Sequence, residues 1–331
     1  MVNLMGVEEV GKKVLLFCDV GIDDSIALIY AYLNDDIDII GIVADYGNVP
    51  RTNALATVRY LQELFGVTTT GQIPIIAGAE RPMTGDLPDF VPEIHGEYGL
   101  GPIIPSNNGE EMDEENFLAI TDIIREYQDE LIVVNIGRLT SLAALFLTYP
   151  QLMATVKRYY VMGGAFWVPG NVTAVSEANF YGDPAAAQIV LLMAQNLTIV
   201  PLNVTERAIA TPRMIDYIDE VGQIKMVKPL LDYYYDFYKK RNPAIQGVPL
   251  HDVLTLMAVL HDAMLSYQYF PLHVVQARQG TERGQSIADI RPYGSLEDET
   301  EKEVGVHRIA FGIDYHRFYT DFMSVLTKQR F

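Results

Sequence analysis

The chain reads VLLFCDVGIDDSIALIYAYLNDDIDIIGIVA from residue 14 to residue 44. Two apolar runs of strand length, residues 14–18 and 37–44, flank a segment of helical periodicity at residues 25–33. The runs largely lack the polar alternation of a strand with one solvated face, so we expect helices on both faces of their sheet. This strand–helix–strand order predicts a βαβ unit with parallel strands.

The same alternation continues along the chain. Further strands are predicted at residues 73–77, 131–135, 159–162 and 197–202, and further helices at residues 52–65, 139–147, 184–194 and 314–326. We therefore predict an α/β fold: one large domain over residues 1–331 with a mostly parallel, doubly wound sheet. A helical insertion near the active site is expected at about residues 211–241. Two connections, residues 80–115 and 163–183, are longer than usual, and long ordered loops are often functional.

Composition and charge exclude several classes of partner. The 331 residues include 24 Lys and Arg but 43 Asp and Glu, so the formal net charge is −19. A phosphate-backbone partner is disfavoured, because sequence-independent nucleic-acid binding needs clustered basic residues. The most apolar stretches, residues 131–134 and 189–193, are far shorter than the roughly 20 residues of a membrane span. We expect neither a nucleic-acid nor a membrane partner.

Cysteine usage and the first residues bear on the compartment. Cys18 is the single cysteine of the sequence, so no internal disulfide can form. Glu8 and Glu9 interrupt the region where a signal peptide would be continuously apolar. Both observations predict a cytoplasmic protein.

An acidic turn follows the first predicted strand. Asp19, Asp23 and Asp24 fall within six residues, and Gly21 permits a tight turn between them. Ligands bind at this edge of open α/β sheets, and clustered carboxylates without histidine favour Ca²⁺ or Mg²⁺ over zinc. The alternative is that Asp23 and Asp24 only complement the dipole of the following helix. That alternative leaves Asp19, which ends a buried strand, unexplained.

Polar side chains also lie in other connections of the predicted sheet. Asn48 follows the second strand, and Asn171, Glu177 and Asn179 lie in the long 163–183 connection. Such side chains bind vicinal hydroxyls well, although each could instead cap a turn. His251-Asp252 opens an apolar helix, where an N-cap role for Asp252 is the alternative.

Taken in order, these residues resemble the inosine-uridine nucleoside hydrolase family. Its N-terminal signature is Asp-x-Asp-x-x-x-Asp-Asp, whose last three acids are Asp19, Asp23 and Asp24 here. The resemblance covers nearly the whole chain and continues through Gly47-Asn48, residues 95–101, residues 162–166, Gly170-Asn171, residues 177–179, residues 183–187 and His251-Asp252.

Two positions and one stretch depart from the family pattern. Phe17 stands where the family usually has its first Asp, and Val20 where Pro is usual. Since that first Asp is not a direct metal ligand in the family, its loss is expected to alter the support of the site rather than abolish it. Residues 135–141 match the family's Gly-x-Leu-Thr-Asn stretch loosely.

The resemblance implies hydrolysis of the N-glycosidic bond of a ribonucleoside to ribose and free base. It implies one Ca²⁺ and a homo-oligomer, a dimer or tetramer. The implied metal ligands are Asp19, Asp24, the Ile136 carbonyl and Asp252. The implied substrate-binding residues are Asp23, Asn48, His95, Asn171, Glu177, Asn179 and Asp252.

Two of these residues are expected to carry the proton transfers. Asp19 would take a proton from the attacking water, and His251 would protonate the leaving base. A histidine suits this role because it titrates near neutral pH, although His251 could instead fill the turn before its helix. Tyr238 and Trp167 are the candidates for stacking on the base. A preference for purine or pyrimidine is not readable from these residues.

Two other functions are alternatives to nucleoside hydrolysis. A phosphatase of the haloacid-dehalogenase type needs two aspartates spaced two residues apart, and neither Phe17 nor Gly21 provides the partner of Asp19. A nucleoside-binding or sensing protein on the same scaffold would explain Phe17 and Val20 as signs of decay. The enzyme is favoured by the joint presence of four residues: Asp19, Asp24, His251 and Asp252.

Overall fold

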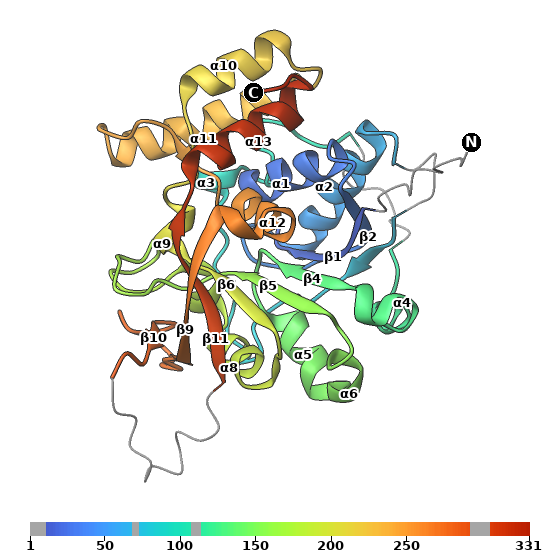
Figure 1. Cartoon of the computed structure of the whole chain (residues 1–331), viewed down its shortest axis with the longest axis vertical. Coiled ribbons are helices and arrows are strands. Elements are labelled where there is room, and N and C mark those ends of the chain that lie inside the picture. The colour runs from blue at the N-terminus through green and yellow to red at the C-terminus, as the bar shows by residue number, and fades with distance from the viewer. Residues whose placement is uncertain (1–10, 68–72, 107–113, 292–304) are drawn as a thin grey trace, which may run out of the picture.

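A nine-stranded sheet forms the centre of the protein. The computed structural model describes residues 11–67, 73–106, 114–291 and 305–331, and its sheet has the order β10-β9-β11-β6-β5-β4-β1-β2-β3 (Figure 1). The strands are β1 (Lys12–Cys18), β2 (Ile37–Ala44), β3 (Ile75–Ala77), β4 (Ile132–Asn135), β5 (Arg158–Met162), β6 (Leu197–Val200), β9 (Leu265–Val274), β10 (Ser286–Ala288) and β11 (Val306–Ile313). A separate two-stranded sheet pairs β7 (Ile209–Ala210) with β8 (Val248–Pro249).

Helices connect the strands and cover the sheet. They are α1 (Ile22–Tyr32), α2 (Arg51–Leu64), α3 (Pro92–His95), α4 (Ala119–Tyr127), α5 (Thr140–Thr148), α6 (Pro150–Met153), α7 (Ala178–Gly182), α8 (Pro184–Met193), α9 (Leu202–Thr205), α10 (Pro212–Val221), α11 (Val227–Arg241), α12 (His251–Leu260) and α13 (Tyr315–Thr327). Among the described helices, none is long and apolar enough to cross a membrane.

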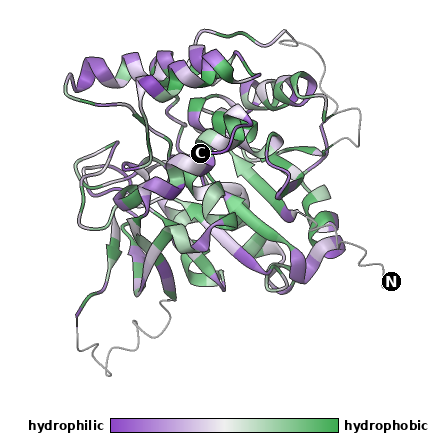
Figure 2. Ribbon diagram, turned by 45° about the horizontal axis from the view of Figure 1, so that its top comes forward, coloured by the Kyte–Doolittle hydropathy of each residue, from purple (hydrophilic) through white to green (hydrophobic). Residues whose placement is uncertain are grey.

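The central strand β1 shows why the sheet is buried on both faces. Val14, Leu16 and Cys18 point into one core, which α1, α2 and α12 cover. Leu15 and Phe17 point into a second core, which α4, α5 and α8 cover. Figure 2 shows the central strands in the green of apolar residues. This two-faced burial confirms the predicted doubly wound α/β domain.

The parallel part of the sheet agrees closely with the prediction, and β2 has the predicted bounds. The main difference lies in residues 265–313, for which no strands were predicted. There β9 pairs antiparallel with both β10 and β11, while β11 pairs parallel with β6, so the sheet is mixed. The predicted insertion corresponds to α10 and α11. Glu8 and Glu9, on which the predicted cytoplasmic location partly depends, lie outside the residues that the structure describes.

Candidate active site

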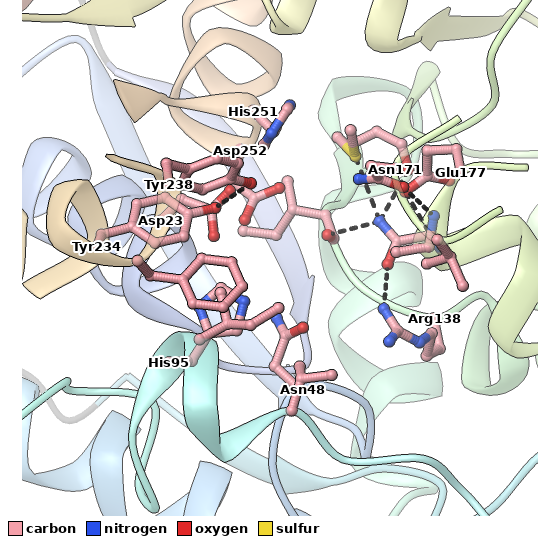
Figure 3. A pocket seen from close by; sticks show the side chains of 18 of the residues that line it. Asp23, Asn48, His95, Arg138, Asn171, Glu177, Tyr234, Tyr238, His251 and Asp252 are labelled. Atoms are coloured by element: carbon pink, nitrogen blue, oxygen red, sulfur yellow. Dashed lines mark hydrogen bonds between the residues drawn. The ribbon is translucent and has the colours of Figure 1, made fainter. Parts of the chain in front are cut away.

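A cavity of about 150 Å³ opens at the carboxyl ends of the parallel strands. In open α/β sheets this is the expected place for a ligand. Figure 3 shows Asp23, Tyr234 and Tyr238 on one side of it and Arg138, Asn171 and Glu177 on the other. Most of the sequence-predicted site residues line it: Asp23, Asn48, His95, Ile136, Asn171, Glu177, Asn179, His251 and Asp252. Asp19 and Asp24 lie behind this lining.

Three buried carboxylates form a group that can hold a cation. One oxygen each of Asp23, Asp24 and Asp252 lies within 4.8 Å of the others. The first turns of α1 and α12 supply them, so the two helices, which pack against each other, bring the acids together. Asp252 is not an N-cap, because Leu250 has that position. An all-oxygen set of this kind fits a hard divalent cation such as Ca²⁺.

The acidic turn is held by the hydrogen bonds that Asp24 accepts. Its Oδ2 accepts from the Gly21 amide at 2.7 Å, and its Oδ1 accepts from the Asp19 amide at 3.3 Å. The Asn48 amide donates to both Asp19 Oδ1 (3.1 Å) and Asp24 Oδ2 (3.3 Å). Asn48 thus ties the end of β2 to the turn after β1.

Asp19 is buried, yet its carboxylate does not belong to the three-carboxylate group. Its Oδ2 lies 3.0 Å from Arg138 Nη1 in an ion pair, without a hydrogen bond. Burial raises the pKa of Asp19 to about 8, and Arg138 opposes that rise. The expected role of Asp19 as a metal ligand therefore stays a prediction.

Burial also dominates the protonation of the other acids. It raises the pKa of Asp23 and of Asp24 to about 7, and it also raises the pKa of Asp252 well above its ordinary value. The carboxylates repel one another as well, which adds to the rise. Without a cation, the group therefore retains protons at neutral pH.

These shifts predict how stability depends on pH when metal is removed. The folded pKa values lie above the ordinary value of 3.8, so the native state binds more protons than the unfolded state between about pH 4 and pH 8. The free energy of unfolding of chelator-treated protein should therefore fall as the pH rises through this window. Ca²⁺ at 100 times its Kd should restore about 2.7 kcal/mol at pH 8 and little at pH 5.

Differential scanning calorimetry at pH 5 and pH 8, with chelator and with Ca²⁺, measures both effects. The Asp252→Asn variant is the matched control, because it keeps the shape of the side chain and removes one charge. It should show a weaker pH dependence and a smaller Ca²⁺ effect. An equal Ca²⁺ effect at both pH values would contradict the prediction.

Both histidines at the cavity are held in defined orientations. His95 Nδ1 accepts from the Ile22 amide at 3.0 Å, and His251 Nδ1 lies 2.8 Å from the Thr205 hydroxyl. Burial lowers the pKa of His251 to about 4 and that of His95 to about 3. The expectation that His251 titrates near neutral pH is therefore wrong for the free protein, in which its ring is neutral.

The long 163–183 connection brings three polar residues to the cavity. Glu177 caps α7, since its carboxylate accepts from the amides of Asn179 and Phe180 and also from that of Gly164. Asn171 Oδ1 accepts from the Ala178 amide at 3.0 Å. Glu177 and Asn171 therefore make the turn-capping contacts that were the alternative to hydroxyl binding. Both residues also line the cavity, so capping does not exclude binding.

The structure shows the surroundings of two departures from the family pattern, Phe17 at the end of β1 and Val20 in the acidic turn. Phe17 is fully buried in the core on the side of α4, α5 and α8, so it serves packing there. Val20 has a φ of 34°, a conformation that L residues rarely adopt. Proline, whose φ is fixed near −65°, could not adopt it.

Some cavity residues were not predicted from the sequence. They are Arg138, Met162, Phe237 and Arg241, together with Thr205 behind His251. Tyr238 lines the cavity as expected. Trp167 does not: it is 58% exposed and stacks on Phe311 with ring centroids 5.5 Å apart. Arg138 and Met162 lie within stretches quoted above for the family resemblance, but nothing in those stretches indicated their place in the cavity.

Comparison with known proteins identifies the family. The family model of inosine-uridine preferring nucleoside hydrolases matches residues 14–320. The chain belongs to this family. Uridine nucleosidase 1 of Arabidopsis thaliana is 30% identical over 265 residues, covering 78% of this chain and 76% of the relative. The inosine-uridine preferring nucleoside hydrolase of Crithidia fasciculata is 28% identical over 285 residues, covering 85% and 88%.

Solved structures of nucleoside hydrolases share the fold. A plant nucleoside hydrolase superposes with a TM-score of 0.88 at 25% identity, covering 96% of this chain and 99% of the other. A purine-preferring ribonucleoside hydrolase from Gardnerella vaginalis gives 0.84 at 26% identity, covering 96% and 98%. The resemblance inferred from the sequence is confirmed, and so is the enzyme class, a hydrolase acting on N-glycosyl compounds.

Proposed function

We propose that this nucleoside hydrolase cleaves the N-glycosidic bond of ribonucleosides with water, releasing ribose and the free base. The observation that carries the proposal is the group of Asp23, Asp24 and Asp252, buried beside a cavity that polar side chains line. Relatives are named for uridine, for inosine and uridine, and for purines. Uridine is therefore the first substrate to test, with inosine and cytidine beside it.

Calcium is the proposed cofactor. Asp24 and Asp252 would hold it together with the Ile136 carbonyl and Asp19, and the neighbouring Asp23 would bind the sugar. The chemistry that such a cation supplies is a lowered pKa of water and a charge that attracts hydroxyl oxygens. The carbonyl of Ile136 lies in the cavity lining and accepts one hydrogen bond, from Asn179, so a lone pair is left for a ligand.

The polar lining would position the ribose. The carboxylate of Asp23 and the amide oxygen of Asn48 can accept hydrogen bonds from sugar hydroxyls, and Nδ2 of Asn171 can donate to them. Holding the sugar in one orientation supplies much of the rate enhancement in reactions of this kind. His95, Glu177, Asn179 and Asp252 complete the proposed sugar and base contacts.

Two residues would assist the proton transfers. Asp19 would take the proton from the attacking water, because its carboxylate is buried beside the proposed Ca²⁺ ligands Asp24 and Asp252 and is held by Asn48 and Arg138. His251, with a neutral ring, would donate a hydrogen bond from Nε2–H to the leaving base, which takes its final proton from solvent. We infer that the Thr205 hydroxyl donates to Nδ1, which places the ring proton on Nε2.

Release of reducing sugar tests the proposal. Uridine, inosine and cytidine are incubated with the protein after chelation, and then after Ca²⁺ is added back in excess of the chelator. We expect sugar release from at least one nucleoside with Ca²⁺ and a loss of at least ~10²-fold with chelator. Binding of all three nucleosides without sugar release would favour the nucleoside-binding alternative. The homo-oligomer and the cytoplasmic location stay predictions.

A further inference from the structure

A permanent cation lies in the wall of the cavity. Arg138 follows β4, and its side chain is almost entirely buried. One guanidinium nitrogen, Nη1, donates to Asn179 Oδ1 at 2.7 Å and lies 3.0 Å from Asp19 Oδ2. A single side chain thus contacts both the proposed base and a proposed sugar-binding residue.

The space for this arginine is built into the chain. A Cβ placed on Gly182 would overlap the Nε and Cδ atoms of Arg138. The backbone also packs closely around Asp19, because a Cβ placed on Gly47 or on Gly137 would overlap atoms of Asp19. Three glycines therefore allow the backbone and the Arg138–Asp19 pair to approach closely.

Arg138 determines which way the Asn179 amide faces. Since a guanidinium only donates, Asn179 must present its oxygen to it. Its Nδ2 then donates to the carbonyls of Ile136 (3.0 Å) and Met162 (3.2 Å). On the other side, Arg138 and the Asn48 amide each face one oxygen of Asp19, so the plane of that carboxylate is also set.

We propose that Arg138 is a positioning residue for nucleoside hydrolysis, which fixes the Asp19 carboxylate and the Asn179 amide from one guanidinium. This inference rests on the proposed function. The competing role is general: a buried cation that only offsets the negative charge of the acids around it. The two roles differ, because positioning needs a nitrogen at the place of Nη1, between Asn179 and Asp19, whereas charge compensation needs only a positive charge nearby.

Three variants separate the two roles. Arg138→Ala should lower kcat on uridine by at least ~10²-fold. Arg138→Lys should remain at least ~10-fold below wild type, since the lysine Nζ ends one bond short of the Nη1 position. Gly182→Ala keeps the charge and displaces the side chain, so it should lower kcat by at least ~10-fold. Full activity of Arg138→Lys would overturn the proposal.

Chemical rescue gives a readout that a merely structural role would not move. Low-millimolar guanidinium should restore part of the kcat of Arg138→Ala, because the free ion fits the space left behind. Arg283→Ala is the matched control: Arg283 is equally buried and ion-paired with Asp86 at 3.2 Å, but it does not line the cavity. The proposal fails if guanidinium leaves Arg138→Ala unchanged, or raises both variants by the same factor.

Calcium affinity, measured by isothermal titration calorimetry, needs no turnover. Arg138→Lys keeps the charge but loses the contact that orients Asp19, a proposed Ca²⁺ ligand, so it should bind Ca²⁺ at least threefold more weakly than wild type. Unchanged affinity in Arg138→Lys would mean that Arg138 only compensates charge and would overturn the proposal. If wild type binds Ca²⁺ but releases no sugar from any nucleoside, the proposed function fails, and weaker binding by Arg138→Lys would still show that Arg138 positions Asp19.

Discussion

Asp19→Asn is expected to lower kcat on uridine by at least ~10³-fold while the chain stays folded. The asparagine keeps the shape of the side chain and can still accept from the Asn48 amide, but it cannot take a proton from water. It also loses the ion pair with Arg138. A factor of 10³ corresponds to about 4 kcal/mol in the barrier, a loss typical of a missing general base. Steady-state kinetics with near-ultraviolet circular dichroism as a folding check measure it.

Asp45→Asn is the matched control for this variant. Asp45 is also a buried carboxylate at a strand end, and burial raises its pKa to about 8 as well. Its Oδ1 accepts from Ser141 and from the Ala79 amide, and it does not line the cavity. We expect Asp45→Asn to keep turnover within tenfold of wild type. Similar losses in the two variants would mean that a buried negative charge, rather than a base at Asp19, is what the site requires.

The parallel half of the sheet was predictable because its strands are buried on both faces. Continuous apolar runs such as β2 and β4 have no polar alternation, and the helices between them have a clear period. The antiparallel edge gave no such signal. β9 exposes Gln268 and Tyr269 side by side, and β10 is three residues long, so neither strand has a regular pattern.

Some residues of the candidate site were predictable from the sequence and others were not. Residues that directly follow strands, such as Asp19 and Asn48, were predictable, because the carboxyl ends of neighbouring parallel strands meet at one edge. Arg138 and Thr205 were not, because their roles depend on contacts with residues 41 and 46 positions away, Asn179 and His251. No local spacing encodes such pairs. The buried, neutral state of His251 also depends on tertiary packing that the sequence does not display.

The neutral state of His251 shapes the second large effect that we expect. His251→Ala should slow inosine by roughly 10² to 10⁴-fold, the usual contribution of a general acid. It should slow p-nitrophenyl riboside much less, since that leaving group departs without a proton. Because burial lowers the pKa of His251 to about 4, the resting ring is neutral, and its Nε2–H would hydrogen-bond to the leaving base, which takes its final proton from solvent. The kcat of wild type on inosine should therefore not rise as the pH falls from 8 to 6.

Thr205→Val separates the donor from the ring itself. It removes the hydroxyl that contacts His251 Nδ1 while keeping the side-chain volume, so the ring proton is no longer held on Nε2. Inosine should lose part of its rate and p-nitrophenyl riboside almost none. Thr255→Val is the control, because Thr255 donates to the backbone carbonyl of His251 instead of its ring.

The His251→Ala experiment has one outcome that would contradict the assigned role. Equal losses on inosine and on p-nitrophenyl riboside would mean that the imidazole only binds the base or packs in the site. Tyr238, which also lines the cavity, would then be the next residue to test as the donor.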